Sequence, residues 1–228
     1  MLSRERGKTG TVDWPVFSGL PEDEVHSVLA AAHRRRFGSN EVVFHEGDPG
    51  DSLHLLVTGH VRVQVTTPLG DTAILSVLGP GAVFGELALV SESDRRSATI
   101  QCLEHVETLA LHRQDLDALR RRHPSIDRVL LGIVGAQLRA ASARLLETLF
   151  VPAEKRVLRE VLALAHLYGS DDRPGTIPLT QEDLAGLAGT TRPTVNKVLR
   201  AAEDAGVLRL GRGHVDIVNV ELLRRRAR

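Results

Sequence analysis

The segment from Gln181 to Arg200 constrains the fold most strongly, because its residue spacing matches two short helices joined by a tight turn. Ala185 is small enough to stand where the two helices cross, and Gly189 tolerates the positive φ that the turn needs. Five apolar residues are spaced to bury the inner faces of both helices: Leu184, Ala188, Val195, Val198 and Leu199. The segment therefore predicts a helix-turn-helix.

The polar residues of this segment suit a contact with double-stranded DNA. Arg192 and Asn196 fall near the exposed start of the second helix, where arginine can bond guanine and asparagine can bond adenine in the major groove. Thr191 can also cap that helix, and residues 206–218 predict a β-hairpin wing with a basic tip. The residues expected to contact DNA are Thr180, Thr191, Arg192, Thr194, Asn196, Lys197 and Arg212.

The composition indicates a basic surface that is local rather than global. The chain of 228 residues has no formal net charge, whereas Thr180 to the C-terminus carries nine Lys or Arg against six Asp or Glu. The single cysteine, Cys102, excludes a disulfide within the chain and all-cysteine metal centres, and we expect a small core residue on a strand. No segment approaches the roughly 18 apolar residues of a membrane span, and no secretory signal is recognisable. We therefore expect a soluble, cytoplasmic protein without membrane contact.

The first half of the chain has a sequence pattern typical of a β-domain. Residues 1–13 are polar and expected to be disordered, and Pro21–Arg35 is expected to form a helix. Between Phe37 and Leu111, short apolar runs alternate with polar residues and are separated by glycine-rich turns. This pattern predicts a β-sandwich or β-roll.

A long helix and a hinge follow. Apolar residues at near-helical spacing predict one helix from Ser125 to about Thr148. We interpret it as a dimerisation helix; the alternative is a core helix of a monomer. Pro152 breaks the pattern, Lys155–Leu167 is expected to open the second domain, and Asp171–Gly175 is expected to be a loop. The predicted α+β architecture has a β-roll at 14–124, a long helix at 125–150 and a winged helix-turn-helix domain at 151–228.

Two short segments, Phe84–Leu89 and Arg96–Thr99, have the chemistry to bind a small anionic sugar phosphate. Gly85 allows close approach, and backbone N–H groups at the start of a short helix can hold an anion. Arg96 and Ser97 can donate to phosphate oxygens, while Glu86 can accept from a ribose hydroxyl. The residues alone also allow the alternative that Glu86 and Arg96 form a buried structural ion pair.

With this pair of segments, the long helix and the winged helix-turn-helix, the chain from Phe17 to about Arg226 resembles the Crp/Fnr (cyclic AMP receptor protein) family. The resemblance implies a cyclic-nucleotide-binding-like β-roll, a homodimer along the long helix, a C-terminal DNA reader and RNA polymerase as a partner. It also implies a set of nucleotide-contacting positions, matched here by Leu75, Ser76, Gly85, Glu86, Leu87, Ala88, Arg96, Ser97, Ala141 and Ser142.

Three positions depart from the cyclic-AMP-responsive pattern of that family. Ala88 stands where such members can have glycine, and Ala141 lacks the hydroxyl of an adenine-contacting threonine. One lost hydrogen bond to a ligand typically costs on the order of 1 kcal/mol. Pro193 replaces a glutamate that can accept from cytosine, so the operator can differ from the commonest site of the family.

We therefore expect a homodimeric DNA-binding regulator gated by a small effector, with a cyclic nucleotide such as cAMP as the first choice. The alternative is a transcription factor of the same fold that binds DNA without a nucleotide and is controlled by its abundance or by another ligand. The single cysteine excludes the iron–sulfur branch of the family, whereas ten histidines leave a haem branch open. Neither a nucleophile motif nor a metal-ligand spacing indicates an enzyme.

Overall fold

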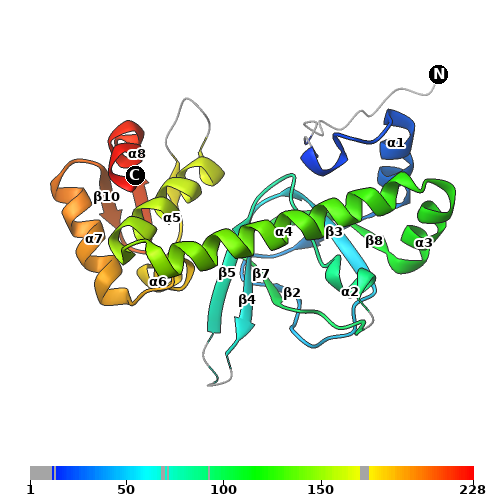
Figure 1. Ribbon diagram of the computed structural model, residues 1–228, viewed down its shortest axis with the longest axis horizontal. Coiled ribbons are helices and arrows are strands. Elements are labelled where there is room, and N and C mark those ends of the chain that lie inside the picture. The colour runs from blue at the N-terminus through cyan, green and yellow to red at the C-terminus, as the bar shows by residue number, and fades with distance from the viewer. Residues whose placement is uncertain (1–11, 13, 68–69, 71, 92, 170–174) are drawn as a thin grey trace.

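The computed structural model describes residues 12–228 except 13, 68–69, 71, 92 and 170–174. The disorder expected for residues 1–13 and nearly all of the loop expected at Asp171–Gly175 lie outside the described residues. The described chain forms a β-rich N-terminal part and a mainly helical C-terminal part, and one long helix runs between them (Figure 1).

The N-terminal part is a β-roll of two antiparallel four-stranded sheets. One sheet has the strand order β1 (His33–Phe37), β8 (Val106–His112), β3 (Ser52–Thr58) and β6 (Val83–Phe84). The other has the order β2 (Val42–Phe44), β7 (Thr99–Cys102), β4 (Val61–Thr66) and β5 (Thr72–Leu78). Residues from both sheets share one apolar cluster, which includes the fully buried Cys102. The expectation of a core cysteine on a strand is thus confirmed.

Short helices cover the end of the β-roll: η1 (Pro15–Phe17), α1 (Glu22–Ala31), α2 (Leu87–Val90) and α3 (Arg113–Arg122). The helix expected over Pro21–Arg35 is wrong in its second half, because the chain leaves the helix at Ala32 and enters β1. Among the described strands, β1 is an edge strand that pairs with β8, and its arginines are exposed. Arg34 and Arg36 both bond Glu107 of β8, and this pairing, which is distant in sequence, favours the strand over the helix.

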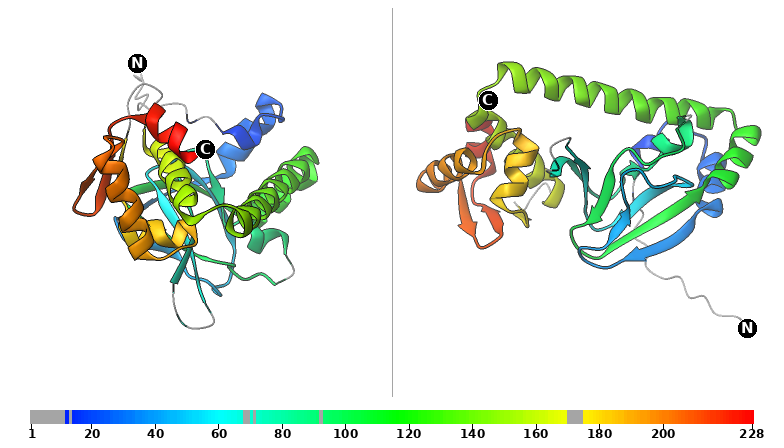
Figure 2. Two further views of the ribbon diagram at one scale, coloured as in Figure 1. Left: turned by 60° about the vertical axis from the view of Figure 1, so that its left-hand side comes forward. Right: turned by 90° about the horizontal axis from the view of Figure 1, so that it is seen from below.

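Helix α4 (Ser125–Phe150) runs past the β-roll as far as the C-terminal part (Figures 1 and 2). Only its first turns are packed into the apolar cluster of α1, α3 and β3, through Ile126 and Leu130. By length and composition α4 is apolar enough to cross a membrane, so the expectation that no segment would approach that limit is wrong. Leucine, isoleucine and valine residues raise the mean hydropathy of α4, but small residues separate them and arginines interrupt the helix at 128, 139 and 144.

The C-terminal part is a winged helix-turn-helix. Its helices are α5 (Ala153–Tyr168), α6 (Gln181–Ala188), α7 (Arg192–Asp204) and α8 (Val220–Ala227). A three-stranded sheet has the order β10 (Leu208–Gly211), β11 (His214–Ile217) and β9 (Thr176–Ile177). All buried members of its apolar cluster lie between Val157 and Ala227, so this part has a core of its own. Helix α8 and the short strand β9 had no clear signal in the sequence.

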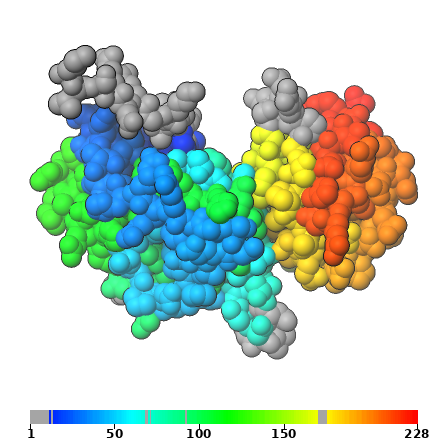
Figure 3. Space-filling model, turned by 180° about the vertical axis from the view of Figure 1, so that it is seen from behind, coloured from blue at the N-terminus to red at the C-terminus, as the bar shows by residue number. Residues whose placement is uncertain are grey.

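The two parts also touch through the β4–β5 hairpin, which packs against α6 along a narrow seam (Figure 3). Arg62 of β4 donates to Asp183 of α6, with 3.1 Å between Nη1 and Oδ1. A Cβ added to Gly186 of α6 would lie 3.5 Å from the Cβ of Ile74 on β5, which is ordinary contact distance. The seam therefore combines an ion pair with close apolar packing.

Candidate DNA interface and effector site

Helix α6 begins with a capping box that fixes the first half of the helix-turn-helix. The N–H of Asp183 donates to Thr180 Oγ1 at 3.2 Å, and the N–H of Thr180 donates to Asp183 Oδ2 at 2.9 Å. Gly189 ends the helix in the left-handed conformation, with φ 58° and ψ 46°. The expected need for glycine in the turn is thus confirmed.

Arg156 of α5 ties this turn to the end of the long helix. Its Nε donates to Ala188 O at 2.9 Å, and its Nη2 donates to Gly189 O at 2.8 Å. Its Nη1 donates to Val151 O at 2.8 Å. One guanidinium thus satisfies carbonyls at the C-terminal ends of both α6 and α4, which are otherwise unpaired in a helix.

Helix α7 presents the predicted DNA contacts on the side away from its core. Val195, Val198 and Leu199 are buried, as expected, while Arg192, Pro193 and Lys197 are exposed and Thr194 and Asn196 are half-buried. Thr191 occupies the N-cap position, but its side chain does not cap a backbone N–H. Its hydroxyl lies 3.0 Å from the hydroxyl of Thr194 instead, so the capping prediction is wrong.

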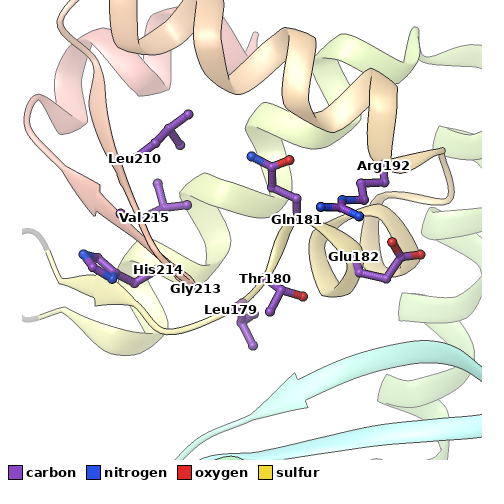
Figure 4. Close-up of a pocket in the computed structure, with 10 residues that line it drawn as sticks. Leu179, Thr180, Gln181, Glu182, Arg192, Leu210, Gly213, His214 and Val215 are labelled. Carbon is purple, nitrogen blue, oxygen red and sulfur yellow. The ribbon is translucent and has the colours of Figure 1, made fainter.

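A groove of about 540 Å³ lies between the start of α6, the start of α7 and the wing (Figure 4). Thr180, Gln181, Arg192 and His214 are among the residues that line it. The wing turn carries Arg212 at its tip, exposed to solvent. Of the predicted contacts, Thr180 and Arg192 line this groove directly, and Arg212 lies next to it in the wing turn.

The N-terminal part holds the predicted anion-binding segments at the start of α2. Arg96 is buried, and its Nη1 donates to Ser52 O at 2.6 Å and to Gly85 O at 2.9 Å. Its guanidinium also lies 4.0 Å from the ring centroid of Phe44, an arrangement that favours a cation–π contact. Its Nε is buried without a hydrogen-bond partner.

Glu86 is almost completely buried beside Arg96 and pairs with the long helix. Gln137 of α4 donates from Nε2 to Glu86 Oε1 at 2.7 Å, whereas Glu86 Oε2 is buried without a partner. Burial raises the pKa of the Glu86 carboxyl, and the Gln137 bond and the Arg96 charge offset this only in part. No hydrogen bond or ion pair between Glu86 and Arg96 occurs among their described contacts, so the alternative of a structural ion pair lacks support.

The other residues expected at this site are spread between the segments around α2 and Arg96, the β4–β5 hairpin and the long helix. Ala88 is buried, and a Cβ added to Gly50 would lie only 2.2 Å from the Cβ of Ala88. Ser97 is exposed next to Arg96. On β5, Leu75 is exposed where the pairing register with β4 shifts, and Ser76 is half-buried opposite Val63. Ala141 and Ser142 are exposed on α4.

Sequence reasoning missed several residues that shape both sites. Gln137, Phe44 and Ser52 contact Glu86 or Arg96 although they are distant in sequence. No local motif predicts these contacts. Arg156 was given no structural role from the sequence, although it bonds the helix-turn-helix directly. Among the described residues, no group of three or more His, Cys, Asp or Glu is arranged to hold a metal ion.

Comparison with known proteins agrees with this geometry. The chain is 39% identical over 212 residues to the cyclic AMP receptor protein of Thermus thermophilus. The match covers 92% of this chain and 94% of that protein. The chain belongs to the Crp/Fnr family. The profile of the cyclic nucleotide-binding domain matches residues 34–123 of this family member, and the profile of the Crp-like helix-turn-helix domain matches residues 155–226.

Further relatives support the same placement. The CRP-like cAMP-activated global transcriptional regulator of Mycobacterium tuberculosis is 31% identical, and the match covers 93% of this chain and 96% of that protein. The crystal structure of the Thermus thermophilus catabolite activator protein aligns with a TM-score of 0.55 at 37% identity, covering 93% and 98% of the two chains. This Crp/Fnr member is therefore a DNA-binding transcription regulator with a cyclic-nucleotide-binding domain, which implies a role in regulation rather than in catalysis.

Proposed function

We propose that this Crp/Fnr member is a homodimeric transcription regulator whose DNA binding is gated by a cyclic nucleotide such as cAMP. One observation carries the proposal: a buried carboxylate oxygen, Glu86 Oε2, and a buried guanidinium nitrogen, Arg96 Nε, both lack partners in the same site. Buried polar atoms without partners are rare in folded proteins. A ligand with a hydroxyl donor and an anionic group would supply both missing partners.

The residues present fit such a ligand. Glu86 would accept a hydrogen bond from a ribose hydroxyl, and Arg96 and the exposed Ser97 would donate to a phosphate. Gly85 has φ 83°, and a Cβ there would lie 2.7 Å from Arg96 Nη1, so only glycine lets the backbone approach the guanidinium so closely. The relatives of Thermus thermophilus and Mycobacterium tuberculosis are named for cyclic AMP, which supports a cyclic nucleotide as the effector class.

The homodimer is proposed from the unpartnered face of α4. Six large apolar side chains on this helix are between 57% and 77% exposed, although water disfavours such a concentration: Leu131, Leu138, Leu145, Leu146, Leu149 and Phe150. Leu131, Leu138 and Leu145 recur every seven residues, the spacing of a coiled-coil seam. A second copy of α4 would cover this stripe.

The gating path would run along α4. Gln137 joins this helix to Glu86. Val151, the C-cap of the same helix, accepts a hydrogen bond from Arg156, which also bonds the turn of the helix-turn-helix. A ligand can shift such an element only if it binds one of its arrangements better than the other. In a dimer, the two readers would then have to fit half-sites about 34 Å apart.

Two observations favour the alternative, a regulator of the same fold that binds DNA without a nucleotide. Three of the five N–H groups of Arg96 already bond oxygens of Ser52 and Gly85, and Asp51 Oδ1 lies 3.6 Å from Nη2, which leaves few donors for a ligand. Ala141 brings no hydroxyl to α4. Under this alternative, abundance or another ligand would control the protein. In either case we place it in the cytoplasm, away from membranes, with DNA and RNA polymerase as partners.

Calorimetry with cAMP and cGMP on the full-length protein tests the proposal. Glu86→Gln keeps the size of the side chain but weakens the acceptor, so we expect at least tenfold weaker nucleotide binding, equivalent to about 1.4 kcal/mol. Glu22→Gln on the exposed face of α1 is the matched control and should bind as the wild type does. A DNA affinity that is equal with and without nucleotide would refute gating while leaving DNA binding intact.

A further inference from the structure

The carboxamide of Asn196 on α7 is held in one orientation by two neighbours. Arg200 Nε lies 3.2 Å from Asn196 Oδ1, and Gln181 Nε2 lies 3.5 Å from the same atom. The Nε of an arginine can only donate a hydrogen bond. The amide atom that faces Arg200 must therefore be the oxygen, and the assignment of oxygen and nitrogen in this amide follows from chemistry.

This orientation limits what Asn196 can offer to DNA. A carbonyl oxygen has two lone pairs, and here two donors lie within 3.5 Å of it. The amide nitrogen Nδ2 is left with two N–H groups and no acceptor among the described contacts of Asn196. Figure 4 shows the side chain of Gln181 rising from the start of α6 toward α7, within the groove between α7 and the wing.

Asn196 is half-buried on α7 and lies within a row of polar residues. Arg192, Asn196 and Arg200 are spaced four residues apart, so they form one column along α7. The buried residues Val195, Val198, Leu199 and Ala202 occupy the other side of the helix. The column borders the groove that Arg192 and Gln181 line, which is the concave surface of the predicted interface.

We propose that Asn196 reads DNA only as a hydrogen-bond donor and selects guanine, with Gln181 and Arg200 as the positioning residues. The usual pairing of asparagine with adenine needs a free Oδ1 to accept from the adenine amino group, together with Nδ2 donating to N7. Guanine presents two acceptors, O6 and N7, and no donor on its major-groove edge. The inference rests on DNA binding by α7, and it reverses the base preference expected from the residue type alone.

The test uses an operator selected from random duplex DNA with the full-length protein. At each purine of that operator, 7-deaza analogues remove the N7 acceptor, and purine without the 6-amino group replaces adenine. Affinity is measured for the wild type and for Asn196→Ala. We expect one guanine where 7-deaza replacement weakens the wild type about tenfold but leaves Asn196→Ala unchanged. Removal of the adenine amino group should cause no loss that depends on Asn196.

Arg200→Met provides the second arm, because it returns one lone pair to Asn196 Oδ1. Overall affinity can fall through a lost cation, so the readout is base preference, which should move from guanine toward adenine at that one position. Arg209→Met on the exposed face of the wing is the matched control and should leave the preference unchanged. Thermal midpoints of all variants separate this effect from loss of folding.

Two results would overturn the inference. One is an Asn196-dependent loss when the adenine amino group is removed from the wild-type operator, and the other is an unchanged base preference in Arg200→Met. Either result would leave the proposed function standing. A protein that selects no operator at all would refute the DNA-reading function and the inference together.

Discussion

The pKa of His54, which lies near Arg96, can be tested through the pH dependence of protein stability. The side chain is 6% exposed, its ring is parallel to Phe84 at 5.2 Å between centroids, and its Nδ1 lies 3.0 Å from Thr108 Oγ1. Burial lowers the pKa of His54 from 6.5 to about 4, and the nearby charge of Arg96 adds to this effect. The imidazole is therefore neutral in the folded protein at neutral pH.

The sign of the pH effect follows from the two states. Between about pH 6.5 and pH 4 the unfolded chain binds a proton at His54 and the folded protein does not, so acidification favours unfolding. At 1.36 kcal/mol per pH unit, the pKa change corresponds to about 3 kcal/mol of stability that is present above pH 6.5 and lost by about pH 4.

His54→Asn keeps a side-chain group that can hydrogen-bond Thr108 and removes the titrating ring. On acidification we expect the variant to lose about 3 kcal/mol less unfolding free energy than the wild type does. The free energy of unfolding is measured in urea at intervals from pH 7.5 to pH 4. His45→Asn, on an exposed position, controls for the removal of a histidine. If the variant and the wild type lose stability in parallel across this range, the assignment of a buried neutral imidazole is wrong.

Three further perturbations test the couplings between the elements. Arg156→Met removes the donors to Val151, Ala188 and Gly189 and should cost about 2–4 kcal/mol of unfolding free energy by urea titration, with Arg156→Lys losing less. Leu138→Asp should yield monomers in sedimentation experiments and lower operator affinity, because it places a charge in the proposed dimer seam. Arg62→Met breaks the ion pair with Asp183 and should speed proteolysis at the hinge; its effect on overall stability should be about 1 kcal/mol or less.

The helix-turn-helix could be predicted because its signals are local. Ala185 and Gly189 are required by helix crossing and turn geometry within a few residues, and the structure places both as expected. Strand β1 could not be predicted in this way, because three consecutive exposed arginines carry no alternating pattern. Its pairing with β8, more than 60 residues away, decides its conformation.

In the candidate effector site, too, some residues could be predicted from local sequence and others could not. Glu86 and Arg96 stand out because a glycine, an acid and an arginine at this spacing fit a sugar phosphate. Their partners do not stand out, because Gln137 and Ser52 act through positions that only folding brings together. The orientation of the Asn196 amide is likewise set by Gln181, on another helix, and by Arg200, one turn further along its own.

The separate core of the C-terminal part has an evolutionary consequence. Every buried residue of that core lies after the hinge, and only a few residues of the β-roll, such as Ile74, Val77 and Leu103, lean against it. A recombination breakpoint near Val151 and Pro152 would therefore leave the interior packing of both halves intact. Such a gene fusion could give this reader a new sensor, and the side chains that would have to adapt lie at the contacts with α6 and with the end of α5, where His60 stacks on Tyr168.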